Sequence, residues 1–560
     1  MASATLDEDA DRSAAADLED EVDGGEVVGA VGIGDATRAL LSAARHSSGL
    51  ARHGGALGVE AARIVAGRSA VAPDARDWRF ADDTWRKHPG YRRLMQAYLA
   101  WGETLSDIVA DADLDWRDRY RAEFLVDLLT AAASPTNTLA GNPAALKRGL
   151  ETAGMSLVRG ARNALRDVRH NRGMPSTVDL SDFELGRNLA ATPGAVVYRD
   201  EVCEVLQYES TTPAVRRRPV LLVPPQIGKY YFMDLAPQRS FVEHAVAHGL
   251  PFFVISWRNP TAEHANWSLD TYAAAVDRAL DVVREIAACD DVNVLGLCAG
   301  GILTAAMLSH LAASGDTRIR TASFGVTLLD FGVPAPIGMF RAGPLIALGR
   351  ERSSRAGVLD ARTLSTVFTL LRPNDLIFKY VVNNYLMGEA PPRFDILAWN
   401  ADGTNLPAQL HRQFLDIYQH NHLADPGSLE VLGTPVDLGR VDIETYVTGA
   451  TSDHLTPWKG CYRTTQLMSG PSTFILSNAG HIASLVNPPG NPKAHYFSGP
   501  EPEGEADTWL EHADKTQGTW WSHWTEWVGE RSGDERRAPA RLGSRRHKPL
   551  GPAPGTYVHG

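Results

Sequence analysis

The residues best suited to chemistry in this chain surround one cysteine, in the sequence Gly-Leu-Cys-Ala-Gly-Gly at residues 296–301. A short apolar run precedes Cys298 and an Ala/Leu-rich stretch follows it, which is the layout of a nucleophile elbow: a strand, a strained turn and then a helix. Gly296 and Gly300 would leave room where strand and helix approach closely. The start of the helix would stabilise a thiolate on Cys298, and the backbone N–H of Ala299 would donate to an oxyanion. The competing interpretation is a buried cysteine in a glycine-rich turn.

A cysteine nucleophile needs a base and a group that orients this base, and the chain supplies both in the expected order. In α/β-hydrolases the acid and then the histidine follow later strands. Asp453 stands just past an apolar run at 443–447, and His481 stands just past another at 474–476. The order and the placement after strands favour a catalytic triad of Cys298, Asp453 and His481.

Further candidates surround this triad. An oxyanion hole normally takes a second N–H from the loop after the third strand, here residues 223–231, where the backbone of Ile227 or a neighbour would donate. A plain turn is the alternative. His454 either assists the acid or, as we favour, contacts the triad residues without itself taking part in the reaction. No ligand pair matches the remaining histidines of this region, so we predict no metal site and structural or surface roles for His411, His420 and His422.

Cysteine in place of the usual serine suits repeated acyl transfer. A thiolate that attacks a thioester makes another thioester, a nearly isoenergetic exchange that keeps the acyl group activated. A later attack by an alcohol then runs downhill to an oxoester. This chemistry permits transfer from CoA thioesters to hydroxyl groups without excluding a hydrolase, and a cap that excludes water would favour transfer.

The hydrophobic pattern predicts the elements that position these residues. Residues 1–35 are acidic and expected to be disordered, and residues 36–193 show apolar side chains at helical spacing, which predicts a helical N-terminal domain. Residues 194–530 alternate short apolar runs with helical stretches, which predicts an α/β-hydrolase fold with a mostly parallel sheet and helices on both faces. Residues 331–440 interrupt this alternation and are expected to form an inserted helical cap. Residues 531–560 are expected to be a solvated, partly ordered C-terminal tail.

Composition excludes several classes of function. A net charge of −12 over 560 residues argues against nucleic-acid binding. Four scattered cysteines do not form a disulfide framework, which favours a reducing compartment. The acidic N-terminus is unlike a signal peptide, and we find no apolar run near 20 residues that would span a membrane. Three tryptophans on one helical face predict a helix that packs on the core: Trp520, Trp524 and Trp527.

Beyond the elbow, the chain resembles the polyhydroxyalkanoate synthases from about residue 75 to 550. The stretches that carry this resemblance include Arg-Phe-Ala-Asp at 79–82, Pro-Pro-Gln-Ile at 224–227, Ser-Trp-Arg-Asn-Pro at 256–260, Arg-Pro-Asn-Asp at 372–375, Asp-His-Leu-Thr-Pro-Trp at 453–458 and Gly-His-Ile-Ala-Ser-Leu-Val-Asn-Pro-Pro-Gly at 480–490. The Pro-Pro-Gln-Ile loop and the closing Pro-Gly-Thr-Tyr-Val-His look most like the class II, medium-chain-length type. The acidic N-terminal extension departs from the family pattern.

The resemblance implies that Cys298 accepts the acyl group, that His481 activates it, and that Asp453 either orients His481 or helps deprotonate the incoming 3-hydroxyl. The implied reaction adds one unit from (R)-3-hydroxyacyl-CoA to a growing polyester and releases CoA; because the CoA thioester is the substrate, no cofactor is expected. The family also implies a homodimer, a mobile cap, granule-associated proteins as partners, and a cytoplasmic location at the surface of polyester granules. A Cys-triad hydrolase of a thioester or lactone is the alternative, and a catalytically silent granule-binding scaffold is a third.

Overall fold

The computed structural model describes residues 37, 49–335 and 344–560 of the chain. The expected disordered stretch, residues 1–35, lies outside the described residues. The chain divides into two compact units. Unit 1 comprises residues 1–179, 343–348 and 363–394, and unit 2 comprises residues 180–342, 349–362 and 395–560. Part of the expected cap, residues 363–394, therefore groups with the N-terminal helices.

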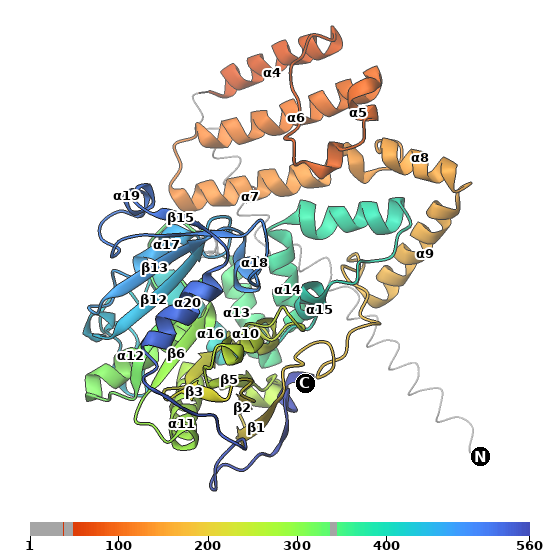
Figure 1. Cartoon of the computed structure of the whole chain (residues 1–560). Coiled ribbons are helices and arrows are strands. Elements are labelled where there is room, and N and C mark those ends of the chain that lie inside the picture. The colour runs from red at the N-terminus through yellow and green to blue at the C-terminus, as the bar shows by residue number, and fades with distance from the viewer. Residues whose placement is uncertain (1–36, 38–48, 336–343) are drawn as a thin grey trace, which may run out of the picture. The chain divides into compact units, whose positions relative to one another are not determined.

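Unit 1 is helical, as the sequence pattern predicted. Asp115 caps one of its helices by accepting hydrogen bonds from the N–H groups of Arg117 and Asp118. Gly160 allows close packing between two segments, because a Cβ there would lie 1.8 Å from the carbonyl oxygen of Tyr385. Three helices lie side by side and two more follow (Figure 1): α4 (Leu50–Val65), α6 (Pro89–Ala110) and α7 (Trp116–Ala132), then α8 (Pro143–Glu151) and α9 (Met155–His170).

Unit 2 is built on an 11-stranded sheet whose order is β15-β14-β13-β12-β7-β6-β4-β5-β2-β1-β17. Its six central strands are parallel and almost wholly buried. They coincide with the six apolar runs expected from the sequence, because strands covered on both faces carry no polar alternation. These strands are β13 (Ser472–Ser477), β12 (Glu444–Ala450), β7 (Ile319–Gly325), β6 (Val292–Leu297), β4 (Val220–Val223) and β5 (Phe252–Trp257).

Antiparallel strands extend the sheet at both edges. A hairpin forms one edge as β1 (Gly194–Arg199) and β2 (Cys203–Tyr208), with β17 (Gly551–Pro552) beside β1. At the other edge lie β14 (His495–Ser498) and β15 (Asp514–Gln517). The parallel centre with antiparallel edges agrees with the predicted α/β-hydrolase fold.

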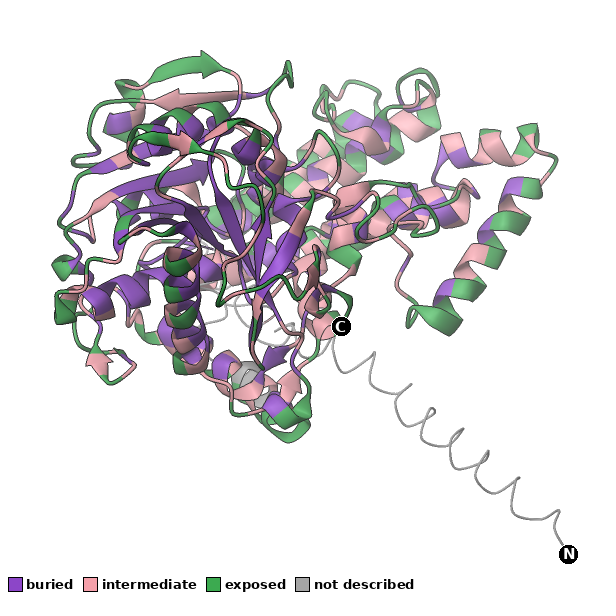
Figure 2. Ribbon diagram, turned by 60° about the horizontal axis from the view of Figure 1, so that its bottom comes forward, coloured by how far each residue is buried: buried purple, intermediate pink, exposed green. Residues whose placement is uncertain are grey.

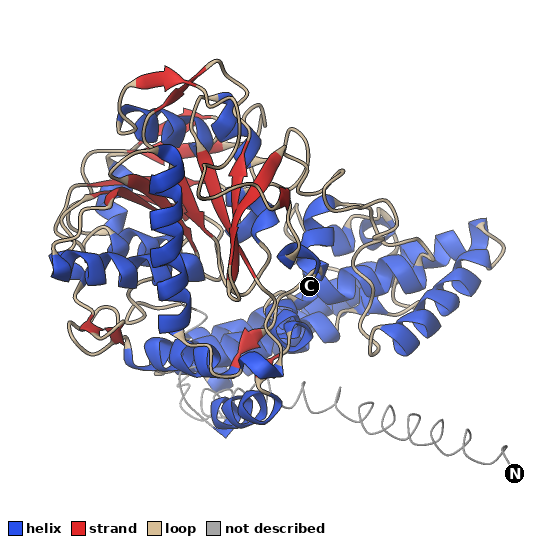
Figure 3. Cartoon of the chain, turned by 90° about the horizontal axis from the view of Figure 1, so that it is seen from below, coloured by secondary structure: helices blue, strands red, loops and turns tan. Residues whose placement is uncertain are grey.

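Helices cover both faces of this sheet (Figure 3). One face carries α11 (Leu269–Ala287), which begins with a capping box at Ser268, together with α12 (Ala299–Ser314) and α17 (Trp458–Thr464). The other face carries α10 (Phe241–Ala247) and the predicted tryptophan helix α20 (Trp520–Glu530). Trp524 of α20 is fully buried and donates its indole N–H to Ser323 of β7 at 2.9 Å. Figure 2 shows the resulting buried centre.

The insertion expected over residues 331–440 lies between β7 and β12. Its helices are α13 (Pro344–Ala356), α14 (Ala361–Leu370), α15 (Asp395–Ala401) and α16 (Ala408–His420). Within unit 2, α16 buries Leu410, Phe414 and Ile417 against the main core. No described helix is both long enough and apolar enough to cross a membrane.

The C-terminal segment, expected to be solvated and partly ordered over residues 531–560, pairs with the rest of unit 2. Two strands in it pair with the rest of unit 2: β16 (Glu535–Arg537) with β3 (Ala214–Arg216), and β17 with β1. Val558 is 1% exposed. The Arg-, Pro- and Gly-rich composition suggested solvation. Composition alone could not reveal the distant polar groups that bind this segment.

Candidate active site

Cys298 occupies the strained turn that the sequence predicted. It lies between the end of β6 and the start of α12 and has φ 50° and ψ −120°, a backbone conformation that residues other than glycine rarely adopt. Two backbone hydrogen bonds hold it there: its N–H donates to Gly325 of β7 at 2.9 Å, and its carbonyl accepts from Gly301 at 2.9 Å. The half-buried thiol therefore stands at the carboxyl end of the parallel sheet.

The flanking glycines are required by close approach. A Cβ at Gly296 would lie 2.5 Å from the Thr304 hydroxyl and 2.9 Å from the Cα of Gly301. A Cβ at Gly300 would lie 2.2 Å from the carbonyl oxygen of Val223, the last residue of β4. The strand and the helix of the elbow thus approach each other as the sequence pattern predicted.

Asp453 and His481 meet at the same edge of the sheet. Asp453 follows β12, and His481 opens α18 (His481–Leu485) after β13. Because these two parallel strands are neighbours, the segments after them lie close together. The Asp453 carboxylate Oδ2 lies 2.7 Å from His481 Nδ1, and both residues are buried.

Thr456 is a part of this site that the sequence reasoning missed. Its hydroxyl donates to Oδ2 of Asp453 at 2.6 Å and lies 3.1 Å from His481 Nδ1. Oδ1 of Asp453 accepts from the N–H groups of Leu455 at 2.8 Å and Thr456 at 2.9 Å. An aspartate that binds the backbone two and three residues ahead is a common turn pattern, so the spacing Asp-x-x-Thr was the available signal. His454 is half-buried beside Asp453, and its supporting role remains a prediction.

The charges of the site reinforce one another. Burial alone would lower the pKa of His481, but the charges of Asp453 and Cys298 and hydrogen bonds to both side chains raise it to about 10. Burial alone would raise the pKa of Asp453, but the charge of His481 and hydrogen bonds from His481 and Thr456 hold it below its ordinary value. At neutral pH the pair is therefore an imidazolium and a carboxylate, with Cys298 close enough to the ring to raise its pKa.

The loop at residues 224–229 lies against the elbow. Val223 is the register partner of Gly296, so this loop leaves the sheet beside Cys298. No described residue accepts a hydrogen bond from the backbone N–H of Ile227 or of Ala299, and Ala299 is the first residue of its helix, where N–H groups have no intrahelical acceptor. Both expected oxyanion donors are therefore available in the described part of the chain.

The same loop contains a second feature that the sequence did not reveal. The Gln226 side chain is buried, and neither its nitrogen nor its oxygen has a hydrogen-bond partner among the described residues. A buried amide without partners costs free energy, so this side chain is unusual at the edge of an active site.

The insertion also reaches the site. Tyr418 of α16 packs on Phe331, with ring centroids 4.6 Å apart. Burial raises the pKa of the Tyr418 hydroxyl, and the charge of Cys298 raises it further. An aromatic residue of the insertion therefore lies close enough to the sulfur to sense its charge.

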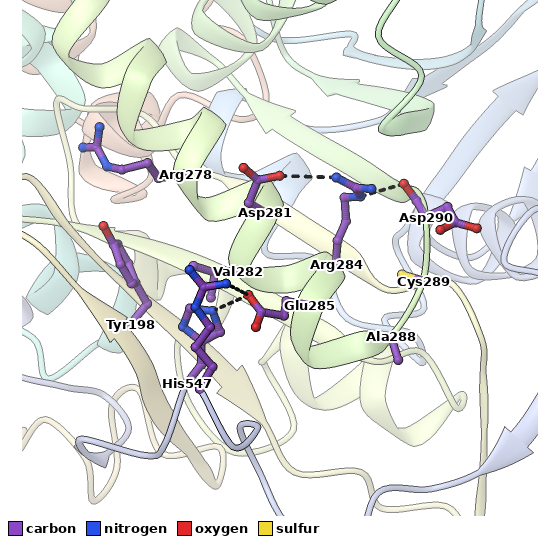
Figure 4. Close-up of a pocket in the computed structure, with 11 residues that line it drawn as sticks. Tyr198, Arg278, Asp281, Val282, Arg284, Glu285, Ala288, Cys289, Asp290 and His547 are labelled. Atoms are coloured by element: carbon purple, nitrogen blue, oxygen red, sulfur yellow. Dashed lines mark hydrogen bonds and ion pairs between the residues drawn. The ribbon is translucent and has the colours of Figure 1, made fainter.

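A pocket elsewhere in unit 2 does not contain the triad (Figure 4). It lies between the end of α11 and residues 546–547, near the start of β6, whereas Cys298 follows the end of that strand. Its basic groups are paired: Arg278 with Asp200, Arg284 with Asp281, and Arg546 and His547 with Glu285. Within the described ranges, no group of three or more His, Cys, Asp or Glu side chains could hold a metal ion.

Comparison with known proteins identifies the family. The family model described as Poly-beta-hydroxybutyrate polymerase (PhaC) N-terminus matches residues 76–245, and the one described as alpha/beta hydrolase fold matches residues 219–488. Poly(3-hydroxyalkanoate) polymerase 1 of Ectopseudomonas oleovorans is 43% identical, covering 94% of each chain. Polymerase 2 of the same organism is 45% identical, covering 92% of each chain. The Poly(3-hydroxyalkanoate) polymerase subunit PhaC of Cupriavidus necator is 39% identical, covering 88% of this chain and 85% of its own.

These relatives cover nearly the whole chain, including both the helical N-terminal region and the α/β-hydrolase fold. They confirm the family that the motifs predicted and the enzyme class that goes with it. The chain belongs to the polyhydroxyalkanoate synthases, the acyltransferases that are also named poly(3-hydroxyalkanoate) polymerases.

Proposed function

We propose that this enzyme transfers (R)-3-hydroxyacyl units from CoA to a growing polyester through an acyl thioester on Cys298. The observation that carries this proposal is the hydrogen-bonded pair of Asp453 and His481 beside Cys298, at the carboxyl ends of three parallel strands. A carboxylate that orients a histidine beside a thiol is the arrangement that activates a nucleophile.

In the first step, the Cys298 sulfur attacks the carbonyl carbon of the CoA thioester. The imidazolium of His481 stabilises negative charge on the sulfur before the attack. The backbone N–H groups of Ala299 and Ile227 stabilise the oxyanion that forms. The bond between carbon and the CoA sulfur then breaks, and the CoA thiolate takes a proton from His481, which leaves the histidine neutral.

In the second step, neutral His481 accepts the proton of an incoming 3-hydroxyl group, whose oxygen attacks the thioester on Cys298. The bond between the acyl carbon and the Cys298 sulfur then breaks, which leaves an oxoester and restores the thiolate beside protonated His481. We assign this proton to His481 and not to Asp453. The Asp453 carboxylate already accepts four hydrogen bonds, two on each oxygen, and its side chain is 0% exposed. It has no position left for a substrate hydroxyl, so its role is to orient and charge the histidine.

The closeness of Tyr418 to Cys298 favours transfer over hydrolysis. An aromatic side chain of the insertion beside the sulfur leaves less room for water to attack the acyl thioester. A Cys-triad hydrolase is the alternative, and it would release free hydroxy acid.

Family membership alone supports what we propose for the cofactor, the oligomeric state, the location and the partners of this enzyme. As in the expectation from the sequence, the CoA thioester is a substrate and no cofactor takes part. The enzyme would act as a homodimer in the cytoplasm, at the surface of polyester granules and beside granule-associated proteins.

The test is to incubate the purified protein with (R)-3-hydroxyacyl-CoA of C4 to C12 chain length and to measure both released thiol and insoluble polyester. We expect each released thiol to be matched by one monomer in the polymer. Cys298→Ala should abolish both, whereas Cys289→Ala, at a half-buried cysteine outside the triad, should change neither. Stoichiometric free acid without polymer would establish the hydrolase instead.

A further inference from the structure

We infer that Lys229 is a positioning residue for acyl transfer and that a C-terminal strap, residues 555–560, holds it in place. Lys229 ends the loop 224–229, which begins where β4 ends and carries Ile227. The inference rests on the proposed function, because it concerns the loop that would supply one oxyanion donor. It assigns to the end of the chain a part in the chemistry that no motif suggested.

The Lys229 side chain is buried and fully bonded. It is 7% exposed and lies 2.9 Å from Oδ1 of Asp402. It donates to the carbonyl oxygens of Val558 at 2.6 Å and Gly560 at 2.7 Å. These three contacts match the three donors of an ammonium group. Because a buried charge is costly without partners, these contacts fix where the end of the loop lies.

The backbone around Lys229 is held as well. Its carbonyl accepts the indole N–H of Trp399 at 2.8 Å, and the preceding Gly228 forms a bridge with Gly403. At the other end of the loop, the Pro224 carbonyl accepts the indole N–H of Trp257 at 2.9 Å. Both ends of the loop are therefore anchored, and Gln226 and Ile227 lie between the anchors.

The strap is anchored to the sheet edge independently of the loop. Glu204 of β2 is 0% exposed and accepts from the N–H of Thr556 at 2.9 Å, from its hydroxyl at 2.9 Å and from the N–H of Tyr557 at 3.1 Å. The Tyr557 hydroxyl donates to the carbonyl of Asp200 at 2.5 Å. A Cβ at Gly555 would lie 2.2 Å from the Glu204 carboxylate. The strap is thus bound both to the β1–β2 hairpin and to the Lys229 ammonium, so the hairpin helps to fix the position of Lys229.

Displacement of this loop should slow only those reactions of Cys298 that pass through an oxyanion. Displacing an oxyanion donor by about 1 Å can slow such a reaction by about a hundred-fold. Alkylation of Cys298 by iodoacetamide forms no oxyanion, because the sulfur displaces iodide from a saturated carbon. Loss of the Lys229 contacts should therefore slow acylation and leave alkylation unchanged.

The experiment compares Lys229→Met and a deletion of residues 555–560 with the unaltered protein. Lys515→Met is the matched control, since Lys515 is exposed on the edge strand β15. Three quantities are measured: CoA released in a single turnover with (R)-3-hydroxyacyl-CoA, the rate of iodoacetamide alkylation of Cys298, and the far-UV circular dichroism. We expect acylation to fall about ten- to a hundred-fold, alkylation to stay within about two-fold, and Lys229→Arg to recover part of the loss.

Unchanged acylation in Lys229→Met would overturn the inference. So would a parallel fall of acylation and alkylation, because that result assigns Lys229 to the stability of the fold alone. If Lys229→Met does not fold, Tyr557→Phe removes one anchor of the strap and allows the same comparison. A failure of the unaltered protein to release CoA would count against the proposed function, while alkylation of its Cys298 would still report a reactive thiol.

Discussion

The substitution Asp453→Asn should leave the fold intact and nearly abolish acyl transfer. The carbonyl oxygen of the introduced amide can accept the two N–H groups now bound by Oδ1, which come from Leu455 and Thr456. The NH2 of this amide then faces His481 Nδ1, which must become an acceptor. The proton of the neutral ring therefore moves to Nε2, and this nitrogen can no longer take a proton from a thiol or a hydroxyl. We expect CoA release to fall by about 10³- to 10⁴-fold, as for the corresponding change in serine protease triads.

The same substitution has a predictable effect on stability. Burial lowers the pKa of His481, but the neighbouring charges and hydrogen bonds outweigh burial and raise this pKa from an ordinary 6.5 to about 10. At pH 7 this shift contributes at most on the order of 4 kcal/mol to the free energy of unfolding. Because the folded-state pKa is raised, the contribution is fully present below pH 6.5 and disappears as the pH rises through about 10. The charge of Asp453 is the largest of the causes that raise this pKa, so the substitution should remove most of the contribution.

The assay is urea unfolding of both proteins at pH values from about 6 to about 10.5, a range that brackets both pKa values of His481, with CoA release measured in parallel. The difference in unfolding free energy should be largest at the acid end of this range and should vanish above a pH of about 10. A difference that does not change with pH, or CoA release within about three-fold of the unaltered protein, would refute the assignment of an Asp–His ion pair.

Three other substitutions and one control test the geometry around the site. Gly300→Ala places a methyl group 2.2 Å from a backbone carbonyl of β4, so the free energy of unfolding measured in urea should fall by about 3 kcal/mol or more. Its control is Gly529→Ala in α20, where no atom lies within 4 Å of the added methyl group and the free energy of unfolding should rise by about 0.5–1 kcal/mol. Gln226→Met removes a buried amide that has no described partner, so the melting temperature should hold or rise; a fall would contradict that environment. Thr456→Val removes a hydroxyl donor to the Asp453 carboxylate, and CoA release should fall about ten-fold with little change in the KM for the CoA thioester; an unchanged kcat would count against this role.

Much of the fold could be predicted because its signals are local. The six parallel strands appear as continuous apolar runs, since helices cover them on both faces. The elbow could be recognised because a cysteine between two glycines follows such a run, and an acid and then a histidine follow later runs in the expected order. Asp453 and His481 follow from the same logic, because residues just past parallel strands collect at one edge of the sheet.

The features that escaped prediction depend on contacts between distant residues. The tail was expected to be solvated, but Thr556 binds Glu204, which lies 352 residues earlier in the chain. Local composition cannot show that a carboxylate is buried at the edge of a sheet and needs donors. Lys229 looked like an ordinary loop residue for the same reason: its partners lie far away in the chain. Thr456 was closer to prediction, since only its spacing from Asp453 had to be noticed.

A thioester on Cys298 would be observed as an acyl group attached to the protein. The enzyme would be mixed with one equivalent of (R)-3-hydroxyacyl-CoA, quenched in acid, digested and analysed by mass spectrometry. We expect the added mass on the peptide that contains Cys298; burial raises the pKa of the other three thiols, Cys203, Cys289 and Cys461. Polymer formation with the acyl mass on another residue, or with an unmodified Cys298 throughout, would contradict a thioester on this sulfur.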